Sequence, residues 1–232
     1  MNKLPDPNSP ESFLSSSSLF QGLPEAVLEK AKSRLLVRQH RPDELLLIEE
    51  DWGNSVYLIV QGWVKIRSYN HEGKEITLNI LGPGDIFGEM AVLLSSPRSS
   101  DVLSLTSVTL GCFPATDFMT LIQSESLIGL RLAQMMARRL QQINRRLRMR
   151  ESDATARVVD ILLFLVESRG KSSTKGIEIP KLSQQEIASL SGIVRETVGR
   201  ELGKLEKKGL IDRSQRDIIC LLNIPALEKY LC

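Results

Sequence analysis

A long run of helical periodicity lies in the middle of the 232-residue chain. Between about Asp117 and Arg150 the apolar residues recur every three or four positions, which is typical of one face of an α-helix. The stripe consists of Leu121, Ile128, Leu132, Met135, Met136, Leu140, Ile143 and Leu147. It continues for roughly nine turns, more than one small domain can cover. We predict that the helix packs on a second copy of itself, although a connecting helix packed only within its own chain would show the same pattern.

Charge is distributed unevenly around this helix. Residues 1–130 carry 10 basic and 16 acidic residues, and residues 131–152 carry seven arginines and one acid. Residues 153–232 carry 13 basic and 11 acidic residues. The formal net charge of the whole chain is only +2, because the acidic first segment offsets the basic segment after it. This separation of acidic and basic residues indicates a modular chain.

The part of the chain before the long helix has a different pattern. Residues 1–18 are rich in Ser, Pro and Asn, which predicts a flexible tail. Between Leu45 and Phe118, short apolar or alternating runs are separated by turn residues. Many short strands at close spacing are typical of an antiparallel barrel or jelly roll, which we expect over residues 19–116.

A second domain is predicted after the long helix. The helical stripe stops near Ser152 and Asp153, either of which could cap a new helix from Ala154. We therefore assign residues 117–152 to the long helix and its hinge, and residues 153–232 to a C-terminal domain.

The C-terminal domain contains the pattern of a helix-turn-helix. Ser183 and Glu186 have the spacing of a capping box, which starts one helix. Gly192 can adopt the positive φ of a tight turn, and the next helix carries Val198 and Leu202 inward. This arrangement places a second helix in the major groove of DNA.

The outward residues of the second helix suit base recognition. Arginine can bond guanine through O6 and N7, as Arg195 and Arg200 would, and Glu196 can accept from cytosine N4. A solvated amphipathic helix with ordinary surface charges is the alternative. The stretch Leu210–Leu222 then predicts a two-stranded wing. Three lysines after the helix could contact phosphates: Lys204, Lys207 and Lys208.

A second constellation lies inside the predicted β-roll. Gly88 allows close approach of a ligand, and the Glu89 carboxylate could accept from a sugar hydroxyl. Arg98 and Ser99 supply a positive charge and donors for a phosphate. Each pair alone would indicate only a surface turn, but together they predict a ligand site.

The sequence also indicates several classes to which we do not expect the protein to belong. The three cysteines are far apart and odd in number, which predicts no disulfide framework and no metal site. No apolar run approaches the roughly 18 residues of a membrane span, and the N-terminus lacks the apolar segment of a secretory signal. No nucleophile and base stand at usable spacing, so we expect no catalytic residues. We expect a soluble cytoplasmic protein without a membrane partner.

The chain resembles the CRP/FNR family of bacterial transcription regulators, and within it the cyclic AMP receptor branch, over about residues 19–224. Gly88-Glu89 and Arg98-Ser99 match the family's phosphate-binding cassette. Met136–Gln141 matches its dimer helix, and Arg195–Arg200 matches its recognition helix.

The resemblance implies an α+β fold in three parts. These are an N-terminal double-stranded β-helix, or jelly roll, that binds a cyclic nucleotide, a long dimerisation helix, and a C-terminal winged helix-turn-helix. It further implies that cyclic AMP is the ligand, with Glu89 on the ribose 2′-hydroxyl and with Arg98 and Ser99 on the phosphate. Arg139 would stand close by, and Asn144 would bond a base edge.

The resemblance also implies a homodimer that binds double-stranded DNA, with RNA polymerase as a protein partner. The expected target is a TGTGA-like palindrome whose G·C pairs are read by Arg195, Glu196 and Arg200. The residues expected on DNA phosphates are Ser183, Gln184, Gln185 and Thr197. The residues expected at the dimer interface are Leu132, Met136, Leu140, Ile143 and Leu147.

The chain departs from the best-known members of the family at two places. Ile143-Asn144 stands where those members have a Thr-Ser pair that bonds adenine, and Val194 stands where a small hydroxyl residue would cap the recognition helix. The effector could therefore be cyclic di-GMP or cyclic GMP instead, or there could be none. A nucleotide-sensing module that regulates a partner protein, without DNA binding, is the third possibility.

Overall fold

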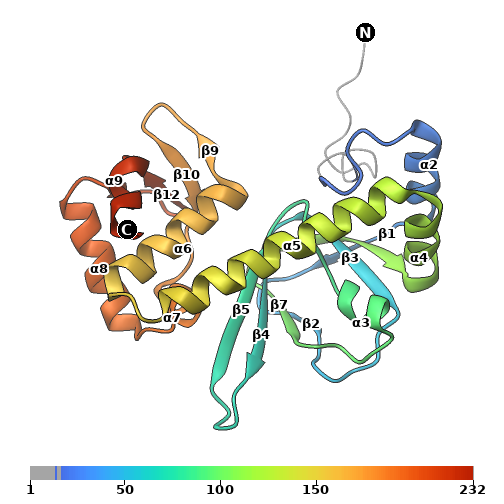
Figure 1. The fold of residues 1–232 in the computed structure, drawn as a ribbon, viewed down its shortest axis with the longest axis horizontal. Coiled ribbons are helices and arrows are strands. Elements are labelled where there is room, and N and C mark those ends of the chain that lie inside the picture. The colour runs from blue at the N-terminus through green and yellow to red at the C-terminus, as the bar shows by residue number, and fades with distance from the viewer. Residues whose placement is uncertain (1–13, 15–16, 232) are drawn as a thin grey trace. The chain divides into compact units, whose positions relative to one another are not determined.

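The computed structural model describes Leu14 and residues 17–231, and Figure 1 shows their fold. The chain divides into two compact units, Met1–Met136 and Ala137–Cys232, and each is described by itself below. The division falls inside the long helix. The tail expected over residues 1–18 lies mostly outside the described residues. Two of its members, Leu14 and Ser17, are buried, so the packed part of the chain begins before residue 19.

The first unit contains two four-stranded antiparallel sheets. The strands of the first sheet lie in the order β1 (Leu36–His40), β8 (Val108–Pro114), β3 (Ser55–Gln61) and β6 (Ile86–Phe87). Those of the second lie in the order β2 (Leu45–Leu47), β7 (Asp101–Ser104), β4 (Val64–Tyr69) and β5 (Glu75–Leu81). Neighbouring strands are mostly far apart in sequence, as the predicted jelly roll requires.

The interior of this β-roll is apolar. Val56 and Leu58 of β3 are fully buried, while Tyr57 between them is only half-buried, because successive strand residues point to opposite faces. The rings of Tyr57 and Phe87 stack with their centroids 5.0 Å apart. Packing of this kind fixes the register of β3 on β6, the strand that leads into Gly88 and α3.

Helices of the first unit pack on the roll. They are α2 (Glu25–Arg34), α3 (Glu89–Leu94), α4 (Ala115–Ser124) and the first part of α5 (Ser126–Met149). Phe113, Phe118, Leu121 and Ile128 form part of one buried cluster with the residues before α2.

The structure corrects two features of the long apolar stripe. Glu125 has extended backbone angles between α4 and α5, so the stripe belongs to two helices instead of one. Leu132, expected at the dimer interface, is 5% exposed and lies in the core of its own unit. The reason is that the N-terminal part of α5 lies on the roll, where its apolar residues are covered by their own chain.

The second unit continues α5 and adds a helical core with a small sheet. Its helices are α6 (Ala154–Arg169), α7 (Gln184–Ser191), α8 (Arg195–Lys207), α9 (Ile224–Glu228) and the short 3₁₀ helix η1 (Lys229–Leu231). Its antiparallel strands lie in the order β11 (Ile211–Asp212), β12 (Ile218–Leu221), β10 (Ile177–Pro180) and β9 (Lys171–Ser172). The predicted two-stranded wing, β11 and β12, is therefore half of a four-stranded sheet.

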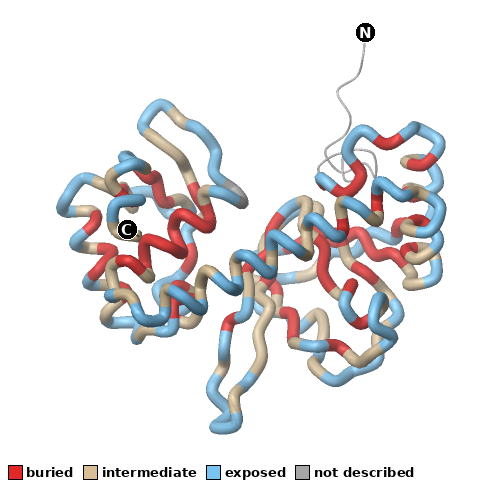
Figure 2. The backbone as a smooth tube through the Cα atoms, viewed as in Figure 1, coloured by how far each residue is buried: buried red, intermediate tan, exposed pale blue. Residues whose placement is uncertain are grey.

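Helix α6 is the centre of the second unit. Asp153 caps it, since its side chain accepts from the backbone N–H of Ala156 at 2.8 Å. Figure 2 shows α6 mostly in the colour of buried residues. A helix that is apolar on most sides must be surrounded by others, and α7, α8, α9 and β10 contact it.

Over the described part of the chain, no helix combines the length and the apolar character that crossing a membrane requires.

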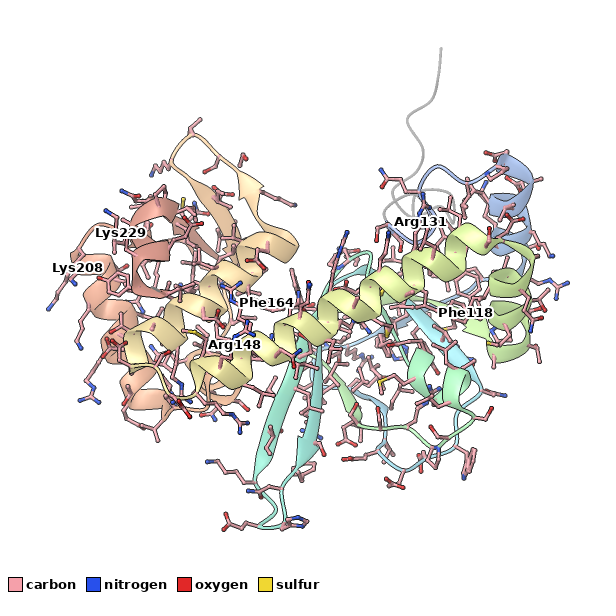
Figure 3. The ribbon with its side chains drawn as sticks, viewed as in Figure 1. Phe118, Arg131, Arg148, Phe164, Lys208 and Lys229 are labelled. Atoms are coloured by element: carbon pink, nitrogen blue, oxygen red, sulfur yellow. The ribbon has the colours of Figure 1, made fainter. Side chains whose placement is uncertain are left out.

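The aromatic cluster of the first unit generates a stability prediction. Phe118, labelled in Figure 3, is 1% exposed, and the centroid of its ring lies 6.3 Å from that of Phe113. We expect Phe118→Ala to lower the free energy of unfolding by about 3–5 kcal/mol, since it removes buried contacts and leaves a cavity. Urea denaturation followed by circular dichroism measures this. Leu94→Ala, at a site 68% exposed, is the control and should change little. An equal loss in both variants would contradict the prediction.

Candidate nucleotide and DNA sites

The predicted cassette residues come together at the N-terminus of α3. Gly88 is the N-cap of this helix at φ +79°, and Glu89 is the first helical residue and is buried. Arg98, nine residues further on, reaches back so that its Nη1 donates to the Gly88 carbonyl at 2.6 Å. Its Nη2 donates to the Ser55 carbonyl at 2.9 Å. The structure thus brings Gly88, Glu89 and Arg98 into one turn of the roll.

The guanidinium of Arg98 has the environment of an anion site. It is 4% exposed and lies 5.9 Å from the centre of the Tyr57 ring. Its buried Nε has no hydrogen-bond partner among the described residues. Burial lowers the pKa of Arg98, because the charged form loses hydration. A buried cation with an unused donor is costly by itself, and the phosphate of a ligand would satisfy both the charge and the donor.

Three residues around the Arg98 guanidinium were not predicted from the sequence: Gly53, Ser55 and Tyr57. A Cβ on Gly53 would lie 2.2 Å from Arg98 Nη2, so only glycine leaves room for the guanidinium. The Ser55 carbonyl and the Tyr57 ring complete its surroundings. The role of Gly53 could not be predicted, because the spacing of a sequence does not show which distant side chain a glycine faces.

The other predicted ligand residues are less enclosed. Ser99 is exposed, and its hydroxyl lies 3.9 Å from the Met90 sulfur. Arg139 is half-buried and Asn144 is exposed, and both belong to the part of α5 in the second unit.

Helix α5 carries an exposed apolar stripe. Leu140, Ile143 and Leu147 are each at least half exposed and are spaced three and four residues apart, so they share one face. Met136 differs, since it is partly buried and packs against the core of the first unit. Exposed leucines at coiled-coil spacing on a long helix are typical of a surface that packs on another helix.

The predicted helix-turn-helix begins with the predicted capping box. The Ser183 hydroxyl accepts from the backbone N–H of Glu186 at 3.2 Å, and the Glu186 carboxylate accepts from that of Ser183 at 2.7 Å. Gly192 ends α7 at φ +66°, as the tight turn requires. Gln184 and Gln185 are exposed in the first turn of α7.

Helix α8 presents its charged residues outward. Val198 and Leu202 are buried, whereas Arg195, Glu196 and Arg200 are exposed. Thr197 is half-buried, and its hydroxyl accepts from Arg200 Nη2 at 2.9 Å. The predicted orientation of this helix is therefore observed.

Contacts from α6 that hold α8 and the turn before it were not predicted from the sequence. Arg157 of α6 donates from Nε to the Ser191 carbonyl at 2.8 Å and from Nη2 to the Gly192 carbonyl at 2.9 Å. Glu201 of α8 is buried and accepts from the Thr155 hydroxyl at 2.7 Å. Helix α6 thus fixes both the turn and the recognition helix.

A helix-turn-helix whose second helix presents arginines outward is typical of DNA-binding proteins, and a roll that buries an arginine with an unused donor is suited to binding an anionic ligand. Comparison with known proteins agrees with both. A family model of the cyclic nucleotide-binding domain matches residues 37–125, and one of the Crp-like helix-turn-helix domain matches residues 156–230.

Relatives extend this similarity over most of the chain. The cyclic AMP receptor protein of Thermus thermophilus is 30% identical over 197 residues, which are 84% of this chain and 88% of the relative. The cAMP-activated global transcriptional regulator CRP of Salmonella typhimurium is 31% identical over 198 residues, 84% of this chain and 94% of the relative. The chain belongs to the CRP/FNR family of transcription regulators. The structure of FixK2 from Bradyrhizobium japonicum shares the fold, with a TM-score of 0.75 and 21% identity over 85% of this chain and 98% of that one.

The start of α8 generates a second stability prediction. Val194 is the N-cap, with extended backbone angles and no side-chain hydrogen bond, and it is 63% exposed. Serine there would accept from the backbone of α8, so we expect Val194→Ser to raise the free energy of unfolding by about 1 kcal/mol. The midpoint of urea unfolding measures this. Val194→Ala is the control, because it shortens the side chain without adding an acceptor. Equal midpoints for the two variants would refute the capping effect.

Proposed function

We propose that the protein is a dimeric transcription regulator that binds cyclic AMP in its β-roll and a TGTGA-like palindrome through α8. The observation that supports the ligand is the buried Arg98 guanidinium, whose Nε has no partner among the residues described and which interacts electrostatically with the buried Glu89 carboxylate. A cyclic nucleotide offers a phosphate and a ribose hydroxyl close together, which matches this pair of groups.

Each ligand residue has a proposed role. Arg98 and Ser99 bind the cyclic phosphate, and Glu89 accepts from the ribose 2′-hydroxyl. Arg139 and Asn144 of α5 complete the set by resemblance to the family. The names of the relatives from Thermus and Salmonella support cyclic AMP as the effector.

Cyclic di-GMP and cyclic GMP are the second candidates. The observation that favours them is Ile143-Asn144, since isoleucine offers no hydrogen bond to adenine and the Asn144 amide can both donate and accept. Competition titrations with the three nucleotides decide between them.

The exposed apolar face of α5 is the observation that favours a dimer. Leu140, Ile143 and Leu147 would be covered by the same residues of a second copy, which removes apolar surface from water. A dimer presents two copies of α8, which suits a palindrome with half-sites about 34 Å apart. The DNA contacts we propose are Arg195, Glu196 and Arg200 on bases, with Ser183, Gln184, Gln185 and Thr197 on phosphates. RNA polymerase is the expected protein partner by family analogy.

The nucleotide acts by population shift. A ligand changes DNA affinity only if it binds one arrangement of the two units more tightly than another. By resemblance to the family, proposed ligand contacts from the roll and from α5 would provide this difference in affinity. By reciprocity, DNA strengthens nucleotide binding by the same factor.

The ligand site is tested by Arg98→Leu. We expect the variant to lose cyclic AMP binding in calorimetry, because the phosphate loses its buried counter-charge, while circular dichroism shows the wild-type fold. Arg38→Leu, at an exposed arginine of β1, is the matched control and should bind as the wild type does. Unchanged affinity of the Arg98 variant would refute the proposed site.

The DNA site is tested by Arg195→Ala. We expect a loss of about 1–3 kcal/mol on the palindrome and a relaxed preference at one guanine, because a bidentate base contact is removed. Mobility shifts on wild-type and G·C-substituted half-sites measure both effects. Lys207→Ala, at an exposed lysine, should weaken binding uniformly if at all. An unaltered preference would count against Arg195 as a base-reading residue.

The third possibility, a module that regulates a partner protein, is tested on the wild type. A wild-type protein that does not bind the palindrome at moderate salt would favour this possibility over DNA binding.

A further inference from the structure

A charged cluster lies inside the second unit, apart from both proposed sites. Asp160 stands in the middle of α6 between apolar residues and is 2% exposed. Carboxylates are almost never buried to this degree without a charged partner. The nucleotide and DNA sites do not use it.

Two consecutive arginines from the end of α5 face this carboxylate. Arg145 forms an ion pair through Nε with Asp160 Oδ1, and its Nη1 donates to Glu167 at 2.8 Å. The Arg146 guanidinium carbon lies 4.6 Å from the centre of the Phe164 ring, a cation–π contact; Phe164 is labelled in Figure 3. Asp160, Phe164 and Glu167 are all on α6, so the cluster joins the end of α5 to α6.

These charges are stable only while the two helices stay together. Burial lowers the pKa of Arg146 to about 10, and the negative charge of Asp160 opposes this shift. Burial likewise raises the pKa of Asp160, and the two arginines oppose it. Removing one partner from such a cluster leaves an uncompensated buried charge, which is strongly unfavourable.

The chain between the helices is short, and α6 carries the recognition helix. Residues 150–153 alone connect α5 to α6. Helix α6 holds the turn before α8 through Arg157 and holds α8 itself through Thr155 and Glu201. Whatever fixes α6 on α5 therefore also fixes the direction of α8 relative to the end of α5.

We infer that Asp160 is a positioning residue for DNA binding, which holds α6 on the arginine pair of α5 and thereby sets the separation of the two recognition helices. This inference rests on the proposed function, since it concerns how a dimer reads two half-sites. Asp160 touches no DNA and acts through Arg145 and Arg146.

The first test measures the contact between the helices and needs no DNA. Hydrogen exchange on the full-length protein compares the wild type with Asp160→Asn, which keeps the shape and removes the charge. We expect faster exchange in the last turns of α5 and unchanged protection in α8. Glu167→Gln is the matched control. The Glu167 side chain is 57% exposed, and its replacement removes a second partner of Arg145 while leaving Asp160 intact. If Asp160→Asn does not fold, Arg145→Met removes the opposite charge and keeps the aliphatic stem.

The second test measures half-site spacing. Affinities are compared for the palindrome, for the same duplex with about five inserted base pairs, half a helical turn, and for a single half-site. We expect the wild type to prefer the uninterrupted palindrome by at least about tenfold, and Asp160→Asn to lose most of this preference. Affinity for the single half-site should not change, because α8 itself is intact.

The outcomes separate the inference from the proposed function. Wild-type exchange in α5 together with wild-type spacing preference in Asp160→Asn would overturn the role of Asp160. An equal loss of affinity for all three duplexes would also overturn it, since that result indicates general destabilisation. Faster exchange in α5 with a wild-type protein that ignores the palindrome would uphold the contact and refute the DNA function. A double variant Arg145→Met/Asp160→Asn should lose no more spacing preference than either single variant.

Discussion

The burial of charge on an apolar background is the constraint on which both units depend. Arg98 in the roll and Asp160 in α6 are each less than 5% exposed, and each finds its partners on other elements of its unit. Arg98 is held by the carbonyls of Gly88 and Ser55, and Asp160 by the end of α5. Because a buried charge is unfavourable without partners, each one links different elements: Arg98 links its loop to β3 and to the start of α3, and Asp160 links α6 to the end of α5.

Helix α5 has different environments along its length. Ile128 and Leu132 are covered by the roll, Leu140 and Leu147 are exposed, and Arg145 is paired with Asp160. A single amphipathic helix can thus contribute to a core, present an exposed apolar face and support α6. This division of roles explains why seven arginines between residues 131 and 152 do not indicate a DNA-binding surface by themselves. At least one of them forms a buried ion pair within the unit.

Structural features that depend only on nearby residues were predicted correctly from the sequence. The capping box at Ser183 and Glu186 and the turn at Gly192 depend on neighbours within a few residues, so their residue types predict their geometry. The inward direction of Val198 and Leu202 follows from helical spacing in the same way. The break at Glu125 was not predicted, because the apolar period continues across it and only the packing of α4 and α5 on the roll requires a bend.

The sequence by itself determined the order of the parts, the helix-turn-helix and the residue types of the cassette, because these depend on periodicity and on short spacings. Only the tertiary structure decided that Gly53 makes room for the Arg98 guanidinium, that Leu132 belongs to its own core, and that Asp160 meets Arg145. Each of these depends on contacts between different helices, strands or loops. The packing of helices and sheets determines which residues contact Gly53, Leu132 and Asp160. The spacing of residues within one segment does not show these contacts.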